Sequence, residues 1–157
     1  MSINTNPTTE LTEEQKNMLF FIYEGEKVAR DVYITLGKIH KNEDTFALMQ
    51  FSEQRHIDCA RDLCDTYGVE TSQVNEDNVG KFESLALQAL YDACAEKGEK
   101  SLHDALEVGE FIESTDIEDL EHASVGMPND VVHIYDNIKK RNLRHLDTFQ
   151  AALSRAA

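Results

Sequence analysis

The strongest constraint on the fold is a helical repeat of apolar residues that runs through four long segments of the chain. In each segment apolar side chains recur every three or four residues, which places them on one face of a helix. Only seven glycines and two prolines occur among 157 residues. The sequence therefore predicts an all-α domain, with long helices at about Leu11–His40, Thr45–Tyr67, Ser101–Ala123 and Asn129–Ser154.

The connections predict how these helices pair. Lys41–Asp44 and Val125–Pro128 are short turns, so each joins two antiparallel neighbours. Between the two pairs lies a polar crossover, Val69–Lys81, followed by a shorter helix at about Phe82–Glu96. Two hairpins joined by one long crossover are the arrangement of a ferritin-like four-helix bundle. The alternative is a five-helix bundle in which the short helix belongs to the core.

Length and charge restrict the class of protein. We expect residues 1–10 to be a disordered N-terminal segment and residues 11–157 to be one domain. Thirty acidic residues against fifteen basic ones give a net charge of −15, which argues against a nucleic-acid partner. No apolar run reaches the roughly 18 residues that span a membrane, and the first residues lack the pattern of a secretory signal. We therefore expect a soluble, cytoplasmic protein without a membrane partner.

The three cysteines predict buried, reduced thiols rather than a disulfide or a thiolate metal site. Cys59 and Cys64 lie in one helical segment and point about 140° apart, so they are not expected to bridge. No C-x-x-C pair occurs in the sequence. Its absence excludes a rubredoxin-like iron centre.

Acidic and histidine residues interrupt the apolar stripes of the first two long helices. Glu26 falls within the apolar arc of the first helix, whereas Glu24 falls on the far side with Asp31 and is predicted to be ordinary surface. Glu53 and His56 lie three residues apart at the centre of the second stripe. This spacing places two potential metal ligands on one inward face.

The last two long helices repeat the pattern. Glu113 and Asp116 interrupt one stripe, with Glu110 at its edge as a weaker candidate. Gly109 lacks a side chain just before them, which lets a neighbouring helix approach. Asn142 and His145 occupy the final stripe at the same three-residue spacing.

These polar groups are predicted to share one layer. If both short turns lie at the same end of the bundle, all of them fall within roughly two helical turns of one another. Burying an unpaired carboxylate costs several kcal/mol, and four acids at one level repel each other. Arg30 and Arg141 lie only at the arc edges, so no inward-facing base is expected to neutralise the acids. A metal site is therefore favoured over a metal-free polar network.

The sequence also resembles the ferritin-like superfamily, especially its rubrerythrin branch. The G-E-K-V-A-R-D-V-Y run at Gly25–Tyr33 looks like the first-helix pattern of rubrerythrins, and S-E-Q-R-H at Ser52–His56 looks like their second-helix metal motif. The chain from about Leu11 to Ala152 is more similar still to an uncharacterised prokaryotic family of ferritin-like domains. The shared motifs include Lys100–Ile117 and His145–Phe149.

The resemblance implies metal ligands at Glu26, Glu53, His56, Glu113 and His145. A typical di-iron bundle carries a second E-x-x-H pair on its last helix, whereas this chain has Asn142 before His145. Asp116 restores the number of acids in this interpretation. Tyr33 lies two turns from Glu26 and is expected to pack in the core, with a hydrogen bond to a ligand as the alternative.

Two iron ions are the expected cofactor, with manganese or zinc as alternatives. Such a site suits an oxidoreductase of the peroxidase or ferroxidase type that acts on hydrogen peroxide or dioxygen. Without a rubredoxin-type site, electrons must come from an external donor. The alternatives are a non-catalytic module for iron binding, iron storage or metal-stabilised structure, and a metal-free helical interaction domain. A homodimer is compatible with all of these functions.

Overall fold

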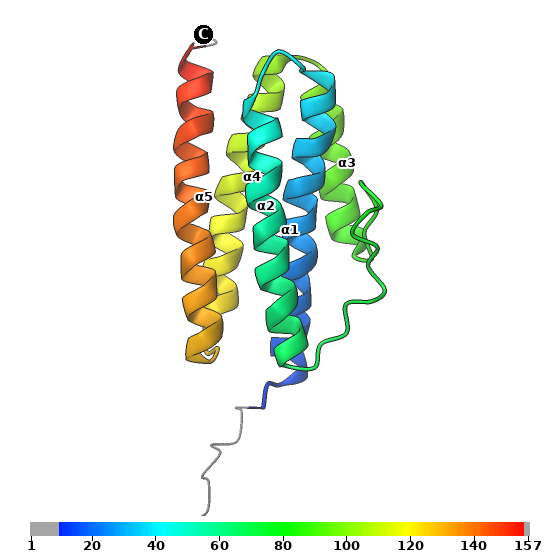
Figure 1. Cartoon of the computed structure of the whole chain (residues 1–157), viewed down its shortest axis with the longest axis vertical. Coiled ribbons are helices and arrows are strands. Elements are labelled where there is room, and N and C mark those ends of the chain that lie inside the picture. The colour runs from blue at the N-terminus through cyan, green and yellow to red at the C-terminus, as the bar shows by residue number, and fades with distance from the viewer. Residues whose placement is uncertain (1–9, 156–157) are drawn as a thin grey trace, which may run out of the picture.

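The computed structural model describes residues 10–155, which form five α-helices and no strand. The helices follow the predicted order, and the short third helix lies three residues later than predicted (Figure 1). No helix within residues 10–155 is both long enough and apolar enough to cross a membrane. The predicted disordered segment falls, apart from Glu10, outside the described residues. The elements are α1 Glu13–Ile39, α2 Thr45–Thr66, α3 Leu85–Glu99, α4 Leu102–Ser124 and α5 Asn129–Arg155.

The helix ends carry the local signals that the sequence contains. Ser101 is the N-cap of α4, and its side chain accepts a hydrogen bond from the amide of Asp104. Gly68 follows the last residues of α2 with a φ of 70°, a left-handed conformation that favours glycine. Gly126 adopts the same conformation, with a φ of 72°, in the α4–α5 turn.

The bundle consists of two antiparallel hairpins, α1–α2 and α4–α5, whose short turns lie at opposite ends (Figure 1). Gln15, near the start of α1, donates a hydrogen bond to the carbonyl of Gly126 in the α4–α5 turn. The condition that both turns share one end is therefore wrong. The predicted layer still forms, because each candidate residue lies near the middle of its helix.

The crossover and α3 return the chain along the bundle from the end of α2 to the start of α4 (Figure 1). Helix α3 packs against α1 and α4 and buries Leu87 and Cys94. Its other face is open, and Leu85 is largely exposed. Helix α3 therefore covers the α1–α4 seam and adds to the core, but it contributes no residue to the polar layer.

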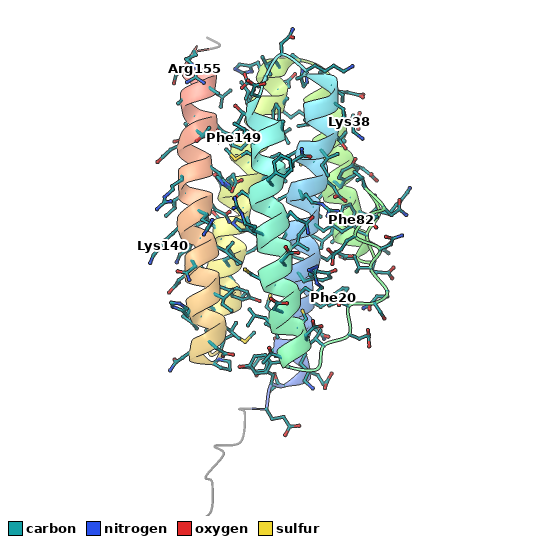
Figure 2. The ribbon with its side chains drawn as sticks, in the orientation of Figure 1. Phe20, Lys38, Phe82, Lys140, Phe149 and Arg155 are labelled. Atoms are coloured by element: carbon teal, nitrogen blue, oxygen red, sulfur yellow. The ribbon has the colours of Figure 1, made fainter. Side chains whose placement is uncertain are left out.

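Two hydrophobic clusters form the core, one toward each end of the bundle. In the first cluster Phe149 projects from α5 into the bundle, whereas Lys38 and Lys140 point outward (Figure 2). The ring of Phe149 lies 5.5 Å from that of Tyr33 and 5.9 Å from that of Phe46, measured between ring centroids. These aromatic contacts join the two hairpins immediately beside the polar layer.

Gly109 makes the close approach of α4 and α5 possible, as the sequence predicts. A Cβ atom at this position would lie 2.3 Å from Cε1 of Phe149, well inside van der Waals contact. Gly25 on α1 is different, because a Cβ atom there would meet no other atom within 4 Å.

The two glycines provide a matched test of this packing. We expect Gly109→Ala to lower the free energy of unfolding by about 1–3 kcal/mol, because the new methyl group overpacks the core against Phe149. Gly25→Ala should raise it by about 0.5–1 kcal/mol, because alanine restricts the unfolded chain without a clash. Urea denaturation of both variants measures the difference. A Gly109→Ala variant as stable as the parent protein contradicts the packing.

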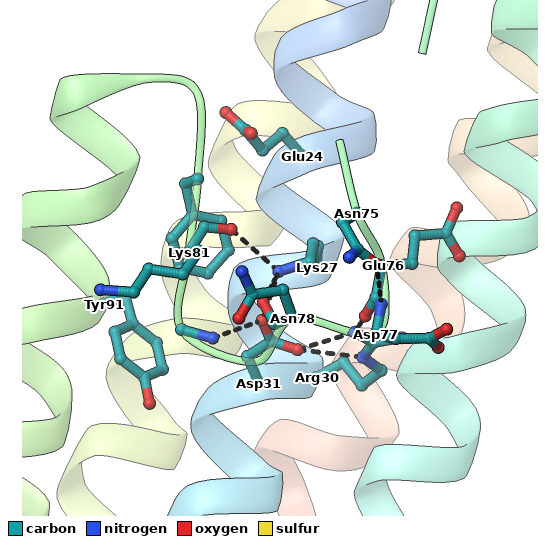
Figure 3. Close-up of polar contacts among 12 residues, drawn as sticks. Glu24, Lys27, Arg30, Asp31, Asn75, Glu76, Asp77, Asn78, Lys81 and Tyr91 are labelled. Atoms are coloured by element: carbon teal, nitrogen blue, oxygen red, sulfur yellow. Dashed lines mark hydrogen bonds and ion pairs between the residues drawn. The ribbon is translucent and has the colours of Figure 1, made fainter. Parts of the chain in front are cut away.

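Helix α1 is surrounded on nearly all sides, which corrects the prediction that Glu24 and Asp31 lie on its surface. Both side chains are fully buried, as is Lys27, which the sequence did not place inward. The crossover covers this face of α1 (Figure 3). The apolar arc therefore describes only the side of α1 that faces the other long helices.

Charged side chains of α1 hold the crossover in place (Figure 3). Lys27 Nζ lies 2.7 Å from Asp31 Oδ2 and donates to the carbonyls of Asn78 and Lys81 at 2.9 and 3.0 Å. Arg30, also buried, donates to the other oxygen of Asp31. Glu24 accepts hydrogen bonds from the amides of Glu83 and Ser84, just before α3. We call Glu24, Lys27, Arg30 and Asp31 the crossover clamp.

The cysteines are partly as predicted. None is in a disulfide, and Cys64 and Cys94 are buried. Cys59 is exposed, however, so the prediction of a buried thiol is wrong at this position. It lies beside Ile134 and Ile138 of α5, with which it lines a groove.

Removing the lysine of the crossover clamp tests its contribution. Lys27→Met should lower the free energy of unfolding by roughly 3 kcal/mol, because it leaves buried carbonyl and carboxylate oxygens without their donor. Amide hydrogen exchange at Gly80, Glu83 and Ser84 should accelerate. Lys16→Met is the control, since Lys16 forms only a 3.9 Å surface pair with Glu13 and its loss should cost less than about 0.5 kcal/mol. Equal effects in the two variants contradict a role for the clamp.

Candidate metal centre

Four helices bring the predicted ligands together in the middle of the bundle. Ligand atoms of Glu26, Glu53 and His56 all lie within 4.8 Å of one another, and so do those of Glu53, Glu113 and His145. Glu53 belongs to both groups, so the two groups adjoin. The three glutamates and His56 are at most 2% exposed. The structure thus places five of the six predicted ligands in two overlapping clusters.

The first cluster joins α1 and α2. His56 Nδ1 lies 3.0 Å from Oε2 of Glu53 and 3.4 Å from Oε2 of Glu26. The three-residue spacing of Glu53 and His56 brings their side chains together on one helix face. Glu26 meets them from α1, and neither of its carboxylate oxygens has a hydrogen-bond partner.

The second cluster joins α2, α4 and α5. His145 Nδ1 lies 3.2 Å from Oε1 of Glu113 and 3.3 Å from Oε1 of Glu53. Tyr33 donates a 2.9 Å hydrogen bond to Oε1 of Glu113. Tyr33 is therefore both a core residue and a hydrogen-bond donor to a predicted ligand. The imidazole rings of His56 and His145 face each other with centroids 6.0 Å apart.

Asp116 lies beside the first cluster, and Asn142 forms a hydrogen bond with its carboxylate. The amide nitrogen of Asn142 donates a 2.5 Å hydrogen bond to Oδ2 of Asp116. Asn142 is fully buried, and its own Oδ1 has no partner. The residue that stands where a typical di-iron bundle has a glutamate thus orients the neighbouring aspartate.

Two other acidic positions lie apart from this centre. Glu110 lines a groove between α3 and α4, so it is not part of the layer. His103, Asp104 and Glu107 form a third close group at the start of α4, but His103 is exposed and pairs with Glu107 at 2.9 Å. Surface carboxylates in such groups are satisfied by water and need no ion.

Several buried polar atoms of the layer have no partner among the protein groups. Both oxygens of Glu26, Oε2 of Glu113 and Nε2 of His56 are buried without a hydrogen-bond partner. Folded proteins leave few such atoms, because each one costs about 1–3 kcal/mol or more when charged. Carboxylates and imidazoles that converge with too few donors form a ligand set that suits iron, manganese or zinc. The residues present therefore fit a bound metal.

Comparison with known proteins identifies the family. Residues 15–156 match the family described as an uncharacterized protein domain, DUF2202. The chain belongs to the DUF2202 family. The uncharacterized protein MJ0754 of Methanocaldococcus jannaschii is 37% identical over 153 residues, which cover 97% of this chain and 82% of that protein. The crystal structure of hypothetical protein MJ0754 from Methanococcus jannaschii matches with a TM-score of 0.90 and 36% identity, over 96% of this chain and 85% of the other.

Burial and mutual repulsion shift the acids of this DUF2202 domain toward their neutral forms. Burial, with repulsion from Glu53, raises the pKa of Glu26 to about 7 and that of Glu113 to about 8. Burial and the charge of Glu26 hold the pKa of Asp116 well above its usual range. Glu53 behaves oppositely, because the attraction of two imidazoles outweighs burial and holds its pKa far below normal.

The two histidines are held in their charged forms. Burial disfavours the charge on His56, but the nearby carboxylates of Glu53 and Glu26, with a hydrogen bond to Glu53, raise its pKa to about 11. Burial also disfavours the charge on His145, but its interactions with Glu113 and Glu53 outweigh burial and raise its pKa to about 9. Protons thus reduce the negative charge of the layer, and a cation bound there would replace them.

The structure adds one residue to this DUF2202 site that the sequence did not single out. Tyr135 of α5 is 1% exposed, and its hydroxyl group has no hydrogen-bond partner. Burial, with the charges of Cys64, Glu26 and Asp116, raises its pKa well above the usual range. The sequence could have indicated Tyr135, because it lies seven residues before Asn142, which is two helical turns along the same stripe.

These pKa values predict how the metal-free protein responds to pH. His56, His145, Glu26 and Glu113 all have folded pKa values above their ordinary values. Protonation of such groups stabilises the fold below the unfolded pKa, and this stability is lost as pH rises through the folded pKa. We expect the melting temperature of metal-free protein to fall between about pH 6 and 9. Glu53, with its lowered pKa, affects only the acid range.

Metal should suppress this dependence, because a bound cation takes the place of the protons. Calorimetric melting curves with and without a saturating divalent metal make the comparison. Parallel pH profiles in the two conditions contradict the assignment of these groups to the metal centre.

Proposed function

We propose that this protein is a ferritin-like bundle that binds two metal ions, most suitably iron, and uses them in peroxide or oxygen redox chemistry. The observation that carries the proposal is the pair of clusters that share Glu53. Within each cluster the ligand atoms lie no more than 4.8 Å from one another. The arrangement of two hairpins with a long crossover supports the ferritin-like assignment.

Each proposed metal position has its own acid and imidazole. Glu26 and His56 serve one position, and Glu113 and His145 serve the other. Glu53 lies between them, with Oε2 toward His56 and Oε1 toward His145, so it would contribute to both positions. Asp116 completes the first position from α4, where Asn142 orients its carboxylate.

The chain supplies positioning and exclusion of water. Two bound iron ions supply reversible one-electron oxidation and reduction, which is the chemistry needed to reduce peroxide or dioxygen. Tyr33 holds Glu113 through its hydroxyl group, and Asn142 holds Asp116 through its amide. The hydrophobic clusters on both sides keep bulk water from the carboxylates. The sequence has no C-x-x-C pair, so electrons must come from an external donor.

A metal-stabilised structural module is the second candidate. The near-complete burial of Glu26, Glu53 and Glu113 favours it, because a closed site is typical of structural metals. Both candidates require bound metal and differ in whether that metal reacts with small oxidants.

Metal binding by matched variants tests the shared requirement. We expect about two ferrous or manganous ions per chain in the parent protein, and less than one in Glu53→Gln, because the carboxylate of Glu53 would contribute to both positions. Glu110→Gln should bind like the parent, since Glu110 lies in the α3–α4 groove. Equilibrium dialysis with elemental analysis gives the stoichiometry. Undiminished binding by Glu53→Gln contradicts the proposed centre.

Reaction with oxidants separates the two candidates. We expect the ferrous protein to be oxidised by hydrogen peroxide faster than by dioxygen, as in a rubrerythrin-like enzyme. Anaerobic stopped-flow absorbance measures both rates. The opposite order favours a ferroxidase or oxygen-activating role, and a ferrous protein inert to both supports the structural module.

A further inference from the structure

A groove of about 320 Å³ runs along the seam between α2 and α5 and ends against the metal centre. These two helices pack more sparsely against each other than the helices of either hairpin do. The nearly buried side chains His56 and Ile138 form the inner wall of the groove. The residues that line it are Arg55, His56, Asp58, Cys59, Ile134, Asn137, Ile138 and Arg141.

One residue of the inner wall, His56, has a buried polar atom without a partner. His56 turns Nδ1 toward Glu53 and Glu26, so Nε2 lies on the side of the ring away from those carboxylates. Nε2 is buried and has no hydrogen-bond partner within residues 10–155. When Nδ1 faces a metal, Nε2 carries the ring proton and needs an acceptor. None of the carboxylates that face Nδ1 can supply it.

The rim of the groove carries two arginines that form no ion pair with a carboxylate of residues 10–155. Within residues 10–155 the arginine ion pairs involve Arg30 and Arg61, and neither Arg55 nor Arg141. Asp58 also lines the groove, but Arg61 pairs with it at 2.7 Å and Gln54 donates to it. The charge that remains at the rim is therefore positive.

We propose that the α2–α5 groove binds a small oxyanion, held between Arg55 and Arg141 against the outer face of His56. Guanidinium groups recognise the planar oxygen pairs of carboxylates and phosphates through two parallel hydrogen bonds. The anion also gives the imidazole N–H the acceptor that it lacks. The groove thereby places an anionic ligand one side chain away from the metal centre.

Cys59 provides a reporter for this site. It lines the groove and is exposed, whereas the other two cysteines are buried. In metal-free protein at constant ionic strength, we expect inorganic phosphate to slow alkylation of Cys59 by uncharged N-ethylmaleimide several-fold, with saturation. Sodium chloride should have no such effect. Cys59→Ser identifies the part of the signal that comes from this thiol.

Arginine variants give the decisive comparison. Arg55→Gln/Arg141→Gln should abolish the protection by phosphate, while Arg144→Gln should retain it, because Arg144 is exposed on α5 but does not line the groove. Acetate in place of phosphate shows whether a carboxylate serves as well. Protection that is absent in the parent, or that persists equally in the double variant, overturns the proposal.

Nuclear magnetic resonance of the histidine side chains tests the depth of binding. The imidazole resonances of His56 should shift with the same phosphate midpoint, and those of exposed His103 should not. Protection of Cys59 without a shift at His56 overturns the placement against the ring. Since these measurements use metal-free protein, failure of the metal proposal leaves them unaffected, and failure here leaves the metal stoichiometry unaffected.

Discussion

The mutual repulsion of carboxylates buried in one layer is the constraint on which the rest of the structure depends. Glu26, Glu53 and Glu113 are nearly inaccessible to water, and the groups that face them are two histidines and the hydroxyl group of Tyr33. A fold that merely needed stability would place apolar side chains at these positions, because a dry polar layer weakens a core. Under the proposed function the layer serves metal chemistry, and the two hydrophobic clusters on either side offset the stability lost there.

The crossover clamp fixes the long polar connection to the bundle. A crossover of polar residues gains little from hydrophobic burial, so charged groups on α1 fix it instead. Lys27 satisfies two crossover carbonyls, and Glu24 satisfies two amides at the start of α3. The same helix therefore organises two buried polar regions with different purposes, one neutralised by its own lysine and arginine and the other left with unpartnered acids.

The sequence was sufficient to locate the layer but not the surroundings of each helix. Glu53 and His56 were evident because α2 has one exposed face, so a polar pair on its inner stripe contrasts with its neighbours. Glu24 and Lys27 were missed because helical periodicity does not show that a distant segment, 76–84, folds over that side of α1. The role of Asn142 was equally hidden, since its hydrogen bond to Asp116 depends on how α4 and α5 are aligned. The role of Gly109 was predictable, because a missing side chain on an apolar stripe allows a neighbouring helix to approach closely.

Locating the metal directly is the strongest test of the account. Crystals of the iron-reconstituted protein can be measured on both sides of the iron absorption edge. The account predicts two anomalous peaks, roughly 3.5–4 Å apart, one beside Glu26 and His56 and the other beside Glu113 and His145, with Glu53 in contact with both. Iron found only at the exposed group of His103, Asp104 and Glu107, or an empty layer in an otherwise unchanged bundle, would contradict it.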